Sequence, residues 1–541
     1  MMAGRGDAAP AVQRESAQGA DFIIVGGGSA GAVLAARLSE DPACSVLLLE
    51  AGGADRHPFY HLPAGFAKMT KGIGSWGWQT VPQRHLGGRV LRFTQARVLG
   101  GGSSINAQIY TRGHPLDYDE WRQAGCTGWG FEDVLPFFRK AEDNDSRSGR
   151  LHGTGGPLGV SRPAAPLPIC EAFFAAGEAV GIPRGDDLAG EDPRGLGFYQ
   201  LTQRRARRSS TSVAYLRPAR GRANLRVRTG AEVARIVIEQ GRATGVEIAG
   251  EGVLRAASGV ILAAGAIGSP RLLMLSGVGE AEHLRGLGLP VVLDQPGVGA
   301  NLQDHLDLFT IGECTGPHTY DRYARPLWSA LAGVRYALTR SGPVASSLFE
   351  TGGFWFADKA ARSPDIQFHL GLGSGIEAGV AAMPDGGVTI NSAYLRPRSR
   401  GTVRLASADP RAAPLIDPNY WADPHDRAMS LEGLRMVREI LGAGPLAPFV
   451  RAERLPGPEV RTEADLVAYA HANCKTDHHP AGTCRMGADA GAVVDPRLRL
   501  YGIEGLRVAD ASVMPTVVSS NTNAAMIMIA EKAADMIRAD I

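Results

Sequence analysis

The fold of this chain is decided by residues 21–31, which read DFIIVGGGSAG. The first five residues form a short, apolar run rich in β-branched side chains, and this pattern predicts a buried strand. Gly26, Gly28 and Gly31 then fit G-x-G-x-x-G, the spacing that lets the backbone turn sharply and approach a pyrophosphate closely. The stretch therefore predicts a strand that runs directly into a phosphate-binding turn.

The residues that follow complete a nucleotide-binding unit. An apolar helical face is predicted through Val33, Leu34 and Leu38, and residues 46–49 predict a second strand that ends in Glu50. Phosphates are expected at the helix N-terminus, and Glu50, 19 residues after Gly31, lies where a ribose-binding carboxylate belongs. The motif alone does not separate FAD from NAD, and a turn that binds nothing is the alternative. The predicted cofactor contacts are Gly26, Gly28, Ser29, Ala30, Gly31, Glu50 and Ala51.

The composition favours a large globular protein. Glycine supplies 70 of the 541 residues, about 13% against a usual ~7%. A hydrophobic fraction of 44% excludes a disordered chain, and no Gly-X-Y period supports collagen. The net charge of +2 argues against a nucleic-acid partner, and no apolar run reaches the ~18 residues of a membrane span. Residues 1–20 lack the apolar segment of a secretory signal, so we expect a mobile leader there and reduced cysteines throughout.

Two further glycine segments extend the cofactor site. Residues 97–106 read RVLGGGSSIN, which can present several backbone N–H groups to an anion or a polar ring; a flexible surface loop is the alternative. Residues 260–265 predict another strand of the first sheet. After it we expect a short helix over residues 271–276, with Ser269 as N-cap, Pro270 at the first helical position and Gly277 at the end.

These segments together resemble the glucose–methanol–choline (GMC) family of FAD oxidoreductases. The resemblance runs from residue 21 to residue 537 and includes residues 296–305 (PGVGANLQDH), 479–487 (HPAGTCRMG) and 507–512 (RVADAS). Within the family the chain looks like the choline-dehydrogenase-like branch. Residues 61–70 and 341–346 look most like the sorbose and related sugar-alcohol dehydrogenases of that branch.

Residues 473–486 hold the densest reactive cluster, and three interpretations compete. Cys474, His478, His479 and Cys484 are candidate zinc ligands, but adjacent histidines point to opposite sides of an extended chain, so we predict no metal site. Histidines bonded within a core are the second interpretation. The third is a catalytic base, which a fixed, neutral imidazole followed by the rigid Pro480 would suit.

The resemblance favours the catalytic base and assigns it to His479. It places Asn523, 44 residues later, against the substrate hydroxyl, with helix capping as the alternative. His478 stands where the family often has tyrosine, and we expect it to tune the pocket or to pair with Asp477. The resemblance also implies FAD contacts by Arg97, Val98, Gly101, Gly102, Asn106, Ala107, Val233, Asp510 and Ala511.

The flavin is predicted to be held without a covalent bond. Some relatives attach it through a histidine just before the asparagine of the glycine loop, and here that position is Ile105, which has no nucleophile. Elsewhere, the basic run at residues 204–208 (RRARR) is interpreted as a solvated loop. Trp76 and Trp78 are interpreted as core residues that could also pack near the flavin.

The resemblance implies an α/β fold with a Rossmann-like, discontinuous FAD-binding domain and a second α+β domain built on a mostly antiparallel sheet that roofs the flavin. We assign residues 20–155, 212–305 and 488–541 to the FAD-binding domain. Residues 156–211 and 306–487 are assigned to the substrate domain. The second domain has few recognisable motifs, although residues 400–405 predict a strand.

The implied reaction is FAD-dependent oxidation of an alcohol CH–OH, with His479 as base, Asn523 orienting the oxygen and hydride passing to flavin N5. The expected substrate is a sugar, a polyol or another primary or secondary alcohol. The electron acceptor is left open between a quinone, a dye-like carrier and oxygen. Alternatives are an alcohol oxidase, a choline dehydrogenase, a non-redox lyase on the same fold, or an NAD-dependent dehydrogenase. We expect a cytoplasmic location, with peripheral association with the inner membrane left open.

Overall fold

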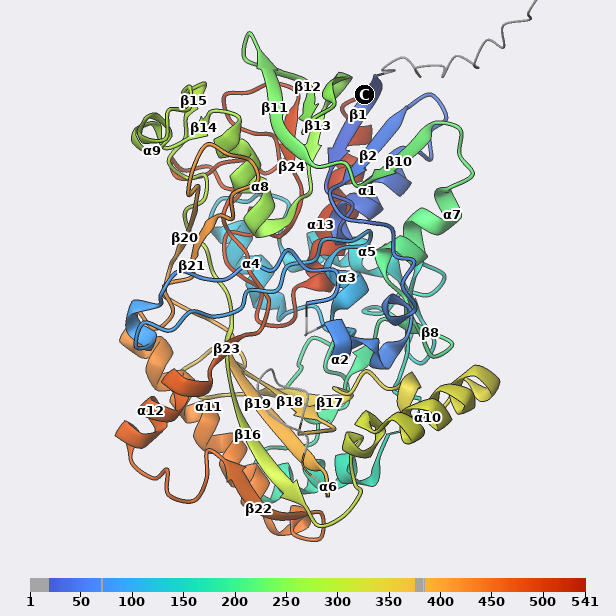
Figure 1. Cartoon of the computed structure of the whole chain (residues 1–541), viewed down its shortest axis with the longest axis vertical. Coiled ribbons are helices and arrows are strands. Elements are labelled where there is room, and N and C mark those ends of the chain that lie inside the picture. The colour runs from blue at the N-terminus through green and yellow to red at the C-terminus, as the bar shows by residue number, and fades with distance from the viewer. Residues whose placement is uncertain (1–18, 70–71, 165, 375–382, 384) are drawn as a thin grey trace, which may run out of the picture.

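The computed structural model describes residues 19–69, 72–164, 166–374, 383 and 385–541. Figure 1 shows two sheets towards opposite ends of the long axis, with the short helices α2 (Phe66–Met69) and α3 (Gly102–Ile105) between them. Most of the predicted leader, residues 1–18, lies outside the described residues. Ala20, the last residue of that prediction, already belongs to the first strand.

The first sheet is the one that residues 21–31 predicted. Its central pairs are parallel, and β12 and β11 extend it through antiparallel pairs. The parallel part joins strands from the start, the middle and the end of the chain, which confirms a discontinuous FAD-binding fold. The strand order is β10 (Leu225–Thr229), β2 (Val46–Glu50), β1 (Ala20–Val25), β13 (Gly252–Leu262), β12 (Arg242–Ile248) and β11 (Val233–Glu239), with β24 (Leu506–Val508) also paired to β13.

Two helices from opposite ends of the chain pack against each other beside this sheet (Figure 1). They are α1 (Ser29–Leu38), which is buried along nearly its whole length, and α13 (Asn523–Arg538). Arg37 of α1 pairs with the fully buried Glu531 of α13 at 2.8 Å, and the Tyr215 hydroxyl donates to the same carboxylate at 2.8 Å. A buried carboxylate needs such partners, because removing one leaves a charge without compensation.

The helix after β13 begins earlier than predicted. It is α8 (Gly265–Leu275), so Ser269 is not its N-cap and Pro270 lies inside it. Proline has no N–H to donate to the carbonyl four residues back. The Thr483 hydroxyl donates to that carbonyl, Ala266 O, at 2.5 Å, and the helix tolerates Pro270 because a distant segment supplies the missing bond. The predicted end is confirmed, since Gly277 follows the last turn with φ 82°.

The second sheet is antiparallel throughout, as expected, in the order β17 (Thr351–Trp355), β18 (Ile366–Gly371), β19 (Gly387–Tyr394), β16 (Leu306–Cys314) and β22 (Val450–Leu455), with β23 (Lys475–Thr476) also paired to β16. Its two faces differ, since successive side chains alternate across a strand. Leu308 and Ile390 join a core that also contains residues of α11 (Pro424–Gly442). Phe309, His369 and Asn391 are register partners on the other face and line a cavity.

The remaining longer helices frame these sheets. No helix of the described residues is both long and apolar enough to cross a membrane. All six cysteines are buried free thiols. The strand predicted at residues 400–405 is β20 (Thr402–Arg404), which pairs with β21 (Leu415–Asp417) in a separate two-stranded sheet. The domain boundaries stay a prediction.

The other longer helices are α4 (Pro115–Gln123), α5 (Phe131–Ala141), α6 (Pro168–Ala179), α10 (Pro326–Thr339) and α12 (Glu463–Asn473).

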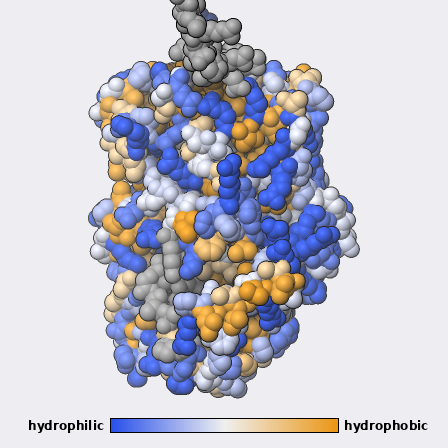
Figure 2. Space-filling model, turned by 45° about the vertical axis from the view of Figure 1, so that its right-hand side comes forward, coloured by the Kyte–Doolittle hydropathy of each residue, from blue (hydrophilic) through white to orange (hydrophobic). Residues whose placement is uncertain are grey.

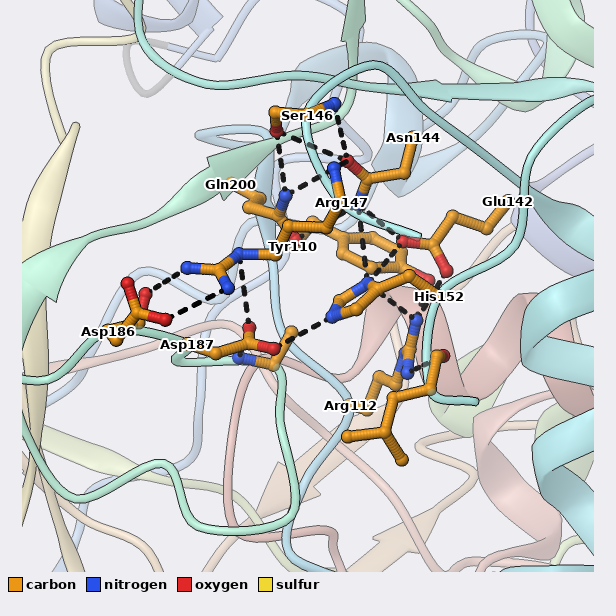
Figure 3. A network of polar contacts seen from close by, with 12 residues as sticks. Tyr110, Arg112, Glu142, Asn144, Ser146, Arg147, His152, Asp186, Asp187 and Gln200 are labelled. Atoms are coloured by element: carbon orange, nitrogen blue, oxygen red, sulfur yellow. Dashed lines mark hydrogen bonds and ion pairs between the residues drawn. The ribbon is translucent and has the colours of Figure 1, made fainter. Parts of the chain in front are cut away.

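A buried polar network stabilises the loops between α5 and β6 (Gly195–Phe198) (Figure 3). His152 lies between two carboxylates, with Nδ1 2.9 Å from Glu142 and Nε2 2.8 Å from Asp187. Arg112, itself buried, forms an ion pair with Glu142. Burial opposes protonation of His152, but the bonds to Asp187 and Glu142 outweigh it and raise its pKa above 6.5. The two carboxylates therefore favour the charged imidazolium, which can donate from both nitrogens.

Replacing His152 with glutamine should lower the thermal midpoint of the holoenzyme, with a cost of about 3 kcal/mol, because it leaves the buried Glu142 and the half-buried Asp187 short of a cation. A raised pKa stabilises the fold below the unfolded value and loses that contribution as pH rises through the folded value. The deficit should thus be larger at pH 6 than at pH 9 in thermal melts. An equal deficit at both pH values, or one matched by the exposed control His85→Gln, would contradict the charged state.

Candidate active site

A cavity of about 440 Å³ lies between the two sheets. It extends from the carboxyl ends of β1 and β2 to the cavity face of the second sheet, and residues 473–475, 477–480 and 521–523 also line it. In α/β sheets of this kind, ligands bind beyond the carboxyl ends of the strands. The position of the cavity therefore agrees with the nucleotide-binding unit that the sequence predicted.

The turn after β1 accepts only glycine at two of its motif positions. Gly26 has φ 103°, and a Cβ there would lie 2.5 Å from the carbonyl oxygen of Ala263. A Cβ on Gly31 would lie 1.9 Å from the carbonyl oxygen of Gly26, so this glycine packs helix against strand. Glu50 is held beside the turn, where its carboxylate accepts from Gly27 N at 2.8 Å and from Gly52 N at 2.7 Å. Burial raises the pKa of Glu50.

The glycine loop at residues 100–106 lies beside this turn. A Cβ on Gly102 would meet no atom of the described residues within 4 Å, although the residue lines the cavity, so the backbone there leaves room for a ligand. Four N–H groups at the start of α1 have no partner within their helix, which suits a pyrophosphate. The open space at Gly102, the glycine turn and the helix N-terminus fit the phosphate part of FAD.

Arg208 holds the end of the glycine loop from behind. Its Nη1 donates to Asn106 O at 2.7 Å, to Asn106 Oδ1 at 2.8 Å and to Ser103 O at 3.2 Å. The solvated-loop interpretation is wrong for this residue, whose exposed fraction is 2%. Nε and Nη2 of Arg208 have no hydrogen-bond partner in the described part of the chain, and burial lowers its pKa to about 9. The loop that faces the cavity is thus fixed by a buried guanidinium that no carboxylate of the described residues neutralises.

Asp510 joins the C-terminal strand β24 to the start of α8. Its Oδ2 accepts from Ser269 Oγ at 2.6 Å and from Gly265 N at 2.9 Å, and its Oδ1 accepts from Ser512 N at 2.8 Å. Burial raises the pKa of Asp510. The residue lines the cavity, but both of its carboxylate oxygens accept hydrogen bonds from the protein. Asp510 therefore holds the end of β24 against the start of α8.

His479 is held on the cavity wall by the segment that precedes β16. Its backbone N–H donates to Asp304 Oδ1 at 2.7 Å, while the Tyr420 and Thr476 hydroxyls donate to Asp304 Oδ2. Burial raises the pKa of Asp304 to about 6. Gln303 and Ala481 exchange backbone hydrogen bonds of 3.0 and 2.9 Å, which pair the two segments. Hydrogen bonds at His479 N and at Ala481, two residues later, therefore fix the backbone around His479.

A chain of hydrogen bonds determines which nitrogen of His479 carries the proton. His305 Nε2 lies 3.1 Å from the carbonyl oxygen of Leu395, which can only accept, so this nitrogen must donate. In a neutral His305 the Nδ1 atom is then an acceptor, and its partner at 2.9 Å, His479 Nδ1, must be the donor. The lone pair of His479 therefore resides on Nε2.

Asn521 meets that lone pair. Its Nδ2 donates to His479 Nε2 at 3.1 Å, and its Oδ1 accepts from Gln367 Nε2 at 2.9 Å and from Thr111 Oγ1 at 3.3 Å. These two donors assign the orientation of the amide, since they require its oxygen on their side. Nε2, the basic atom of His479, therefore contacts Asn521, which itself lines the cavity.

The histidines at this end of the cavity are neutral. Burial, followed by the neighbouring His305, His369, His478 and Lys475, lowers the pKa of His479 well below 6.5. Burial lowers the pKa of His305 to about 4 and that of His369 to about 3. His369 lines the cavity, and its buried Nε2 has no hydrogen-bond partner among the described residues.

Most residues predicted to contact the cofactor line this one cavity. Gly31, Arg97 and Val98 do not: Gly31 packs against Gly26, Arg97 stacks on Trp76 at 4.4 Å and pairs with Glu232 at 2.8 Å, and Val98 is buried. Direct FAD contact stays a prediction for every residue of the set. The residues that line the cavity are Gly26, Gly28, Ser29, Ala30, Glu50, Ala51, Gly101, Gly102, Asn106, Ala107, Val233, Asp510 and Ala511.

The predicted catalytic pair lies in the same cavity, but the two residues are not bonded to each other. Asn523 opens α13 as its first residue, with Thr522 as the N-cap, and Asn523 Oδ1 accepts from Ser29 Oγ at 2.9 Å. His478 lines the cavity with φ 63°. Sequence reasoning missed His305 and Asn521, although His305 ends the family-like stretch at residues 296–305 and Asn521 lies two residues before Asn523.

The histidine cluster also has the make-up of a cation site. Ligand atoms of His305, Asp477 and His479 lie within 4.8 Å of one another. The 2.9 Å contact between His305 Nδ1 and His479 Nδ1 is explained by the hydrogen bond that His479 donates. Asp477 Oδ2 lies 3.4 Å from His479 Nδ1. The predicted zinc candidates were a different set, and the absence of a metal stays a prediction.

The strand ends of the dinucleotide-binding sheet face a buried histidine beneath an antiparallel sheet. Together with the family match, this arrangement makes the chain an FAD-dependent oxidoreductase that acts on CH–OH donors. The chain belongs to the GMC oxidoreductase family, whose N-terminal model matches residues 20–307 and whose C-terminal model matches residues 397–530. This confirms the resemblance read from the sequence, including its choline-dehydrogenase-like branch. The likeness to sorbose dehydrogenases stays a prediction.

Similar proteins cover almost the whole chain. The oxygen-dependent choline dehydrogenase of Sinorhizobium fredii is 41% identical over 525 residues, which are 96% of this chain and 95% of that protein. The mitochondrial choline dehydrogenase of Homo sapiens is 41% identical over 537 residues, 97% of this chain and 90% of that protein. Among solved structures, pyridoxine 4-oxidase from Mesorbium loti has a TM-score of 0.87 at 33% identity, covering 96% of this chain and 99% of the other.

The open space at Gly102 gives a test of the cofactor site that does not depend on catalysis. Gly102→Val should reduce FAD retention by about tenfold or more, because the side chain would project into the cavity without a clash inside the protein. Flavin content after gel filtration and the FAD dissociation constant measure this. Gly221→Val is the matched control, since a Cβ there also meets nothing within 4 Å but lies away from the cavity. Equal flavin content in the two variants would contradict the placement.

Proposed function

We propose that the protein oxidises an alcohol CH–OH to the carbonyl, with His479 as the base. The observation that carries the proposal is the lone pair on His479 Nε2, which the hydrogen-bond chain through His305 fixes on the cavity lining. A general base needs an unprotonated, positioned nitrogen, and the lowered pKa of His479 supplies it at neutral pH. An anaerobic screen of sugars, polyols, aliphatic and benzylic alcohols and choline, read by flavin bleaching, tests this; no bleaching by any alcohol would contradict it.

FAD, when bound, supplies the hydride acceptor. The residues of the chain supply the proton acceptor and the orientation. His479 Nε2 takes the hydroxyl proton after its bond from Asn521 Nδ2 gives way to one from the substrate hydroxyl. The resulting imidazolium keeps its Nδ1–H bond to His305, while Asp477 Oδ2, 3.4 Å from Nδ1, stabilises the charge. Asn523 remains the proposed group that orients the substrate oxygen. Because its Oδ1 accepts from Ser29, its Nδ2 is the group that can donate to a substrate.

The proposed substrate is a sugar, a polyol or another primary or secondary alcohol. Polar groups at the histidine end of the cavity, among them His369 and Asn391, favour a ligand with more than one hydroxyl. Choline is the second candidate, because the relatives at 41% identity are named choline dehydrogenases and because Phe66, Phe309 and Phe349 line the cavity. Aromatic faces attract quaternary ammonium groups.

The proposed electron acceptor is a quinone or a dye-like carrier rather than oxygen, following the dehydrogenase branch of the family. Oxygen is the alternative, since one group of relatives is named oxygen-dependent and the pyridoxine enzyme is named an oxidase. Comparing the reoxidation of the reduced flavin by a quinone analogue and by air-saturated buffer separates the two. Faster reoxidation by oxygen would overturn the dehydrogenase assignment.

His479→Ala should lower the limiting rate of anaerobic flavin reduction by about 10²–10⁴-fold, the range for loss of a general base. In the wild-type enzyme the acid limb of that rate should lie below pH 6.5, because burial depresses the pKa and the base is lost only when His479 protonates. Stopped-flow reduction across pH measures both. The neighbouring His478→Ala variant is the control and should lose far less. An unchanged rate in His479→Ala, with flavin content intact, would refute the role.

His369→Leu should raise the KM for polyhydroxylated alcohols by about tenfold, because it removes a cavity-lining imidazole whose Nε2 has no hydrogen-bond partner among the described residues. The KM for a simple aliphatic alcohol should change little. Steady-state kinetics with a polyol and a monohydric alcohol of similar length measure the difference. A similar KM increase for both alcohols would show that the residue shapes the cavity without contacting a second hydroxyl.

A further inference from the structure

Helix α10 is held to the protein by few buried side chains. Of its 14 residues only Ala332 and Tyr336 are buried. Most helices in proteins owe their stability to an apolar face packed on the protein, and short helices are marginal in water without such packing. The small buried face of α10 therefore gives this helix little packing on the protein.

The outward face of α10 is an apolar stripe. Leu327, Leu331, Val334 and Leu338 are 70%, 53%, 58% and 80% exposed. At about 100° per residue these four side chains fall within about 60° of one another, roughly opposite Tyr336. Trp328, 41% exposed, lies beside the stripe. Figure 2 shows the apolar ridge across the lower part of the visible face. The apolar side of the helix is therefore turned away from the rest of the protein.

Arginines flank this stripe along the sequence between Asp321 and Glu350. Residues 322–349 contain Arg322, Arg325, Arg335 and Arg340 and no aspartate or glutamate. The Tyr336 hydroxyl donates to Ala206 O at 2.8 Å, which ties α10 to the hairpin of β8 (Gln203–Arg204) and β9 (Arg207–Arg208). That hairpin adds the exposed Arg205 and Arg207. None of these six guanidinium groups forms an ion pair with a carboxylate of the described residues.

We infer that α10 and the tip of the β8–β9 hairpin form a docking surface for an anionic lipid membrane. Helices that lie in the membrane interface combine an apolar stripe, an aromatic residue at the boundary and flanking basic residues, and this surface has all three. The stripe would enter the acyl boundary, and the six arginines would contact headgroup phosphates. A second copy of the chain fits less well, because a symmetric contact through the stripe would set these arginines against one another.

Co-sedimentation of the holoenzyme with lipid vesicles tests this surface, independently of turnover. Binding should be strong to vesicles containing phosphatidylglycerol, weak to pure phosphatidylcholine and reduced by salt. L331E/L338E should lower the bound fraction by about tenfold, since it places two charges in the stripe. Val292→Glu is the matched control at a residue that is 47% exposed, and it should bind like wild type. Flavin content and thermal midpoint check that both variants are folded.

Trp328 gives a second readout in the same experiment. Brominated lipids should quench tryptophan fluorescence in wild type and much less in Trp328→Phe. The proposal is overturned if wild type does not bind phosphatidylglycerol vesicles, or if L331E/L338E binds them as wild type does. It is equally overturned if light scattering shows a dimer that L331E/L338E converts to a monomer while vesicles bind neither form.

Discussion

The proposed chemistry depends on one hydrogen-bond chain, which runs from the carbonyl of Leu395 through His305 to His479. A carbonyl oxygen cannot donate, so it fixes the tautomer of His305, and His305 in turn fixes that of His479. Both imidazoles are buried, which keeps them neutral. Without the carbonyl at the far end, either nitrogen of His479 could carry the proton, and the cavity would face a donor as readily as an acceptor.

The fold serves this chain by bringing remote segments to one place. His305 directly precedes β16, and Leu395 directly follows β19, which pairs with β16. His479 follows β23, which also pairs with β16. The cofactor end is assembled in the same way, since the Ser29–Asn523 and Gly265–Asp510 bonds join the start, middle and end of the chain. The cavity between the two sheets is therefore a product of long-range pairing, and a change in either sheet should be felt at His479.

The sequence predicted those parts that depend on local pattern. Residues 21–31 predicted the strand, turn and helix because glycine spacing and apolar runs act within a few residues. The start of α8 was missed because Thr483, far along the chain, supplies the bond that Pro270 cannot. Arg208 was misread because a basic run is usually solvated, and only the folded chain shows it donating to Ser103 and Asn106. His305 and Asn521 escaped notice because their roles exist only through partners distant in sequence.

The most direct measurement of this account is neutron diffraction from a deuterium-exchanged crystal of the oxidised holoenzyme near pH 7. The hydrogen-bond chain from Leu395 predicts deuterium on His305 Nε2 and on His479 Nδ1, with none on His479 Nε2. Deuterium on His479 Nε2, whether in the other tautomer or in an imidazolium, would show that this nitrogen is not the resting base and would contradict the central claim.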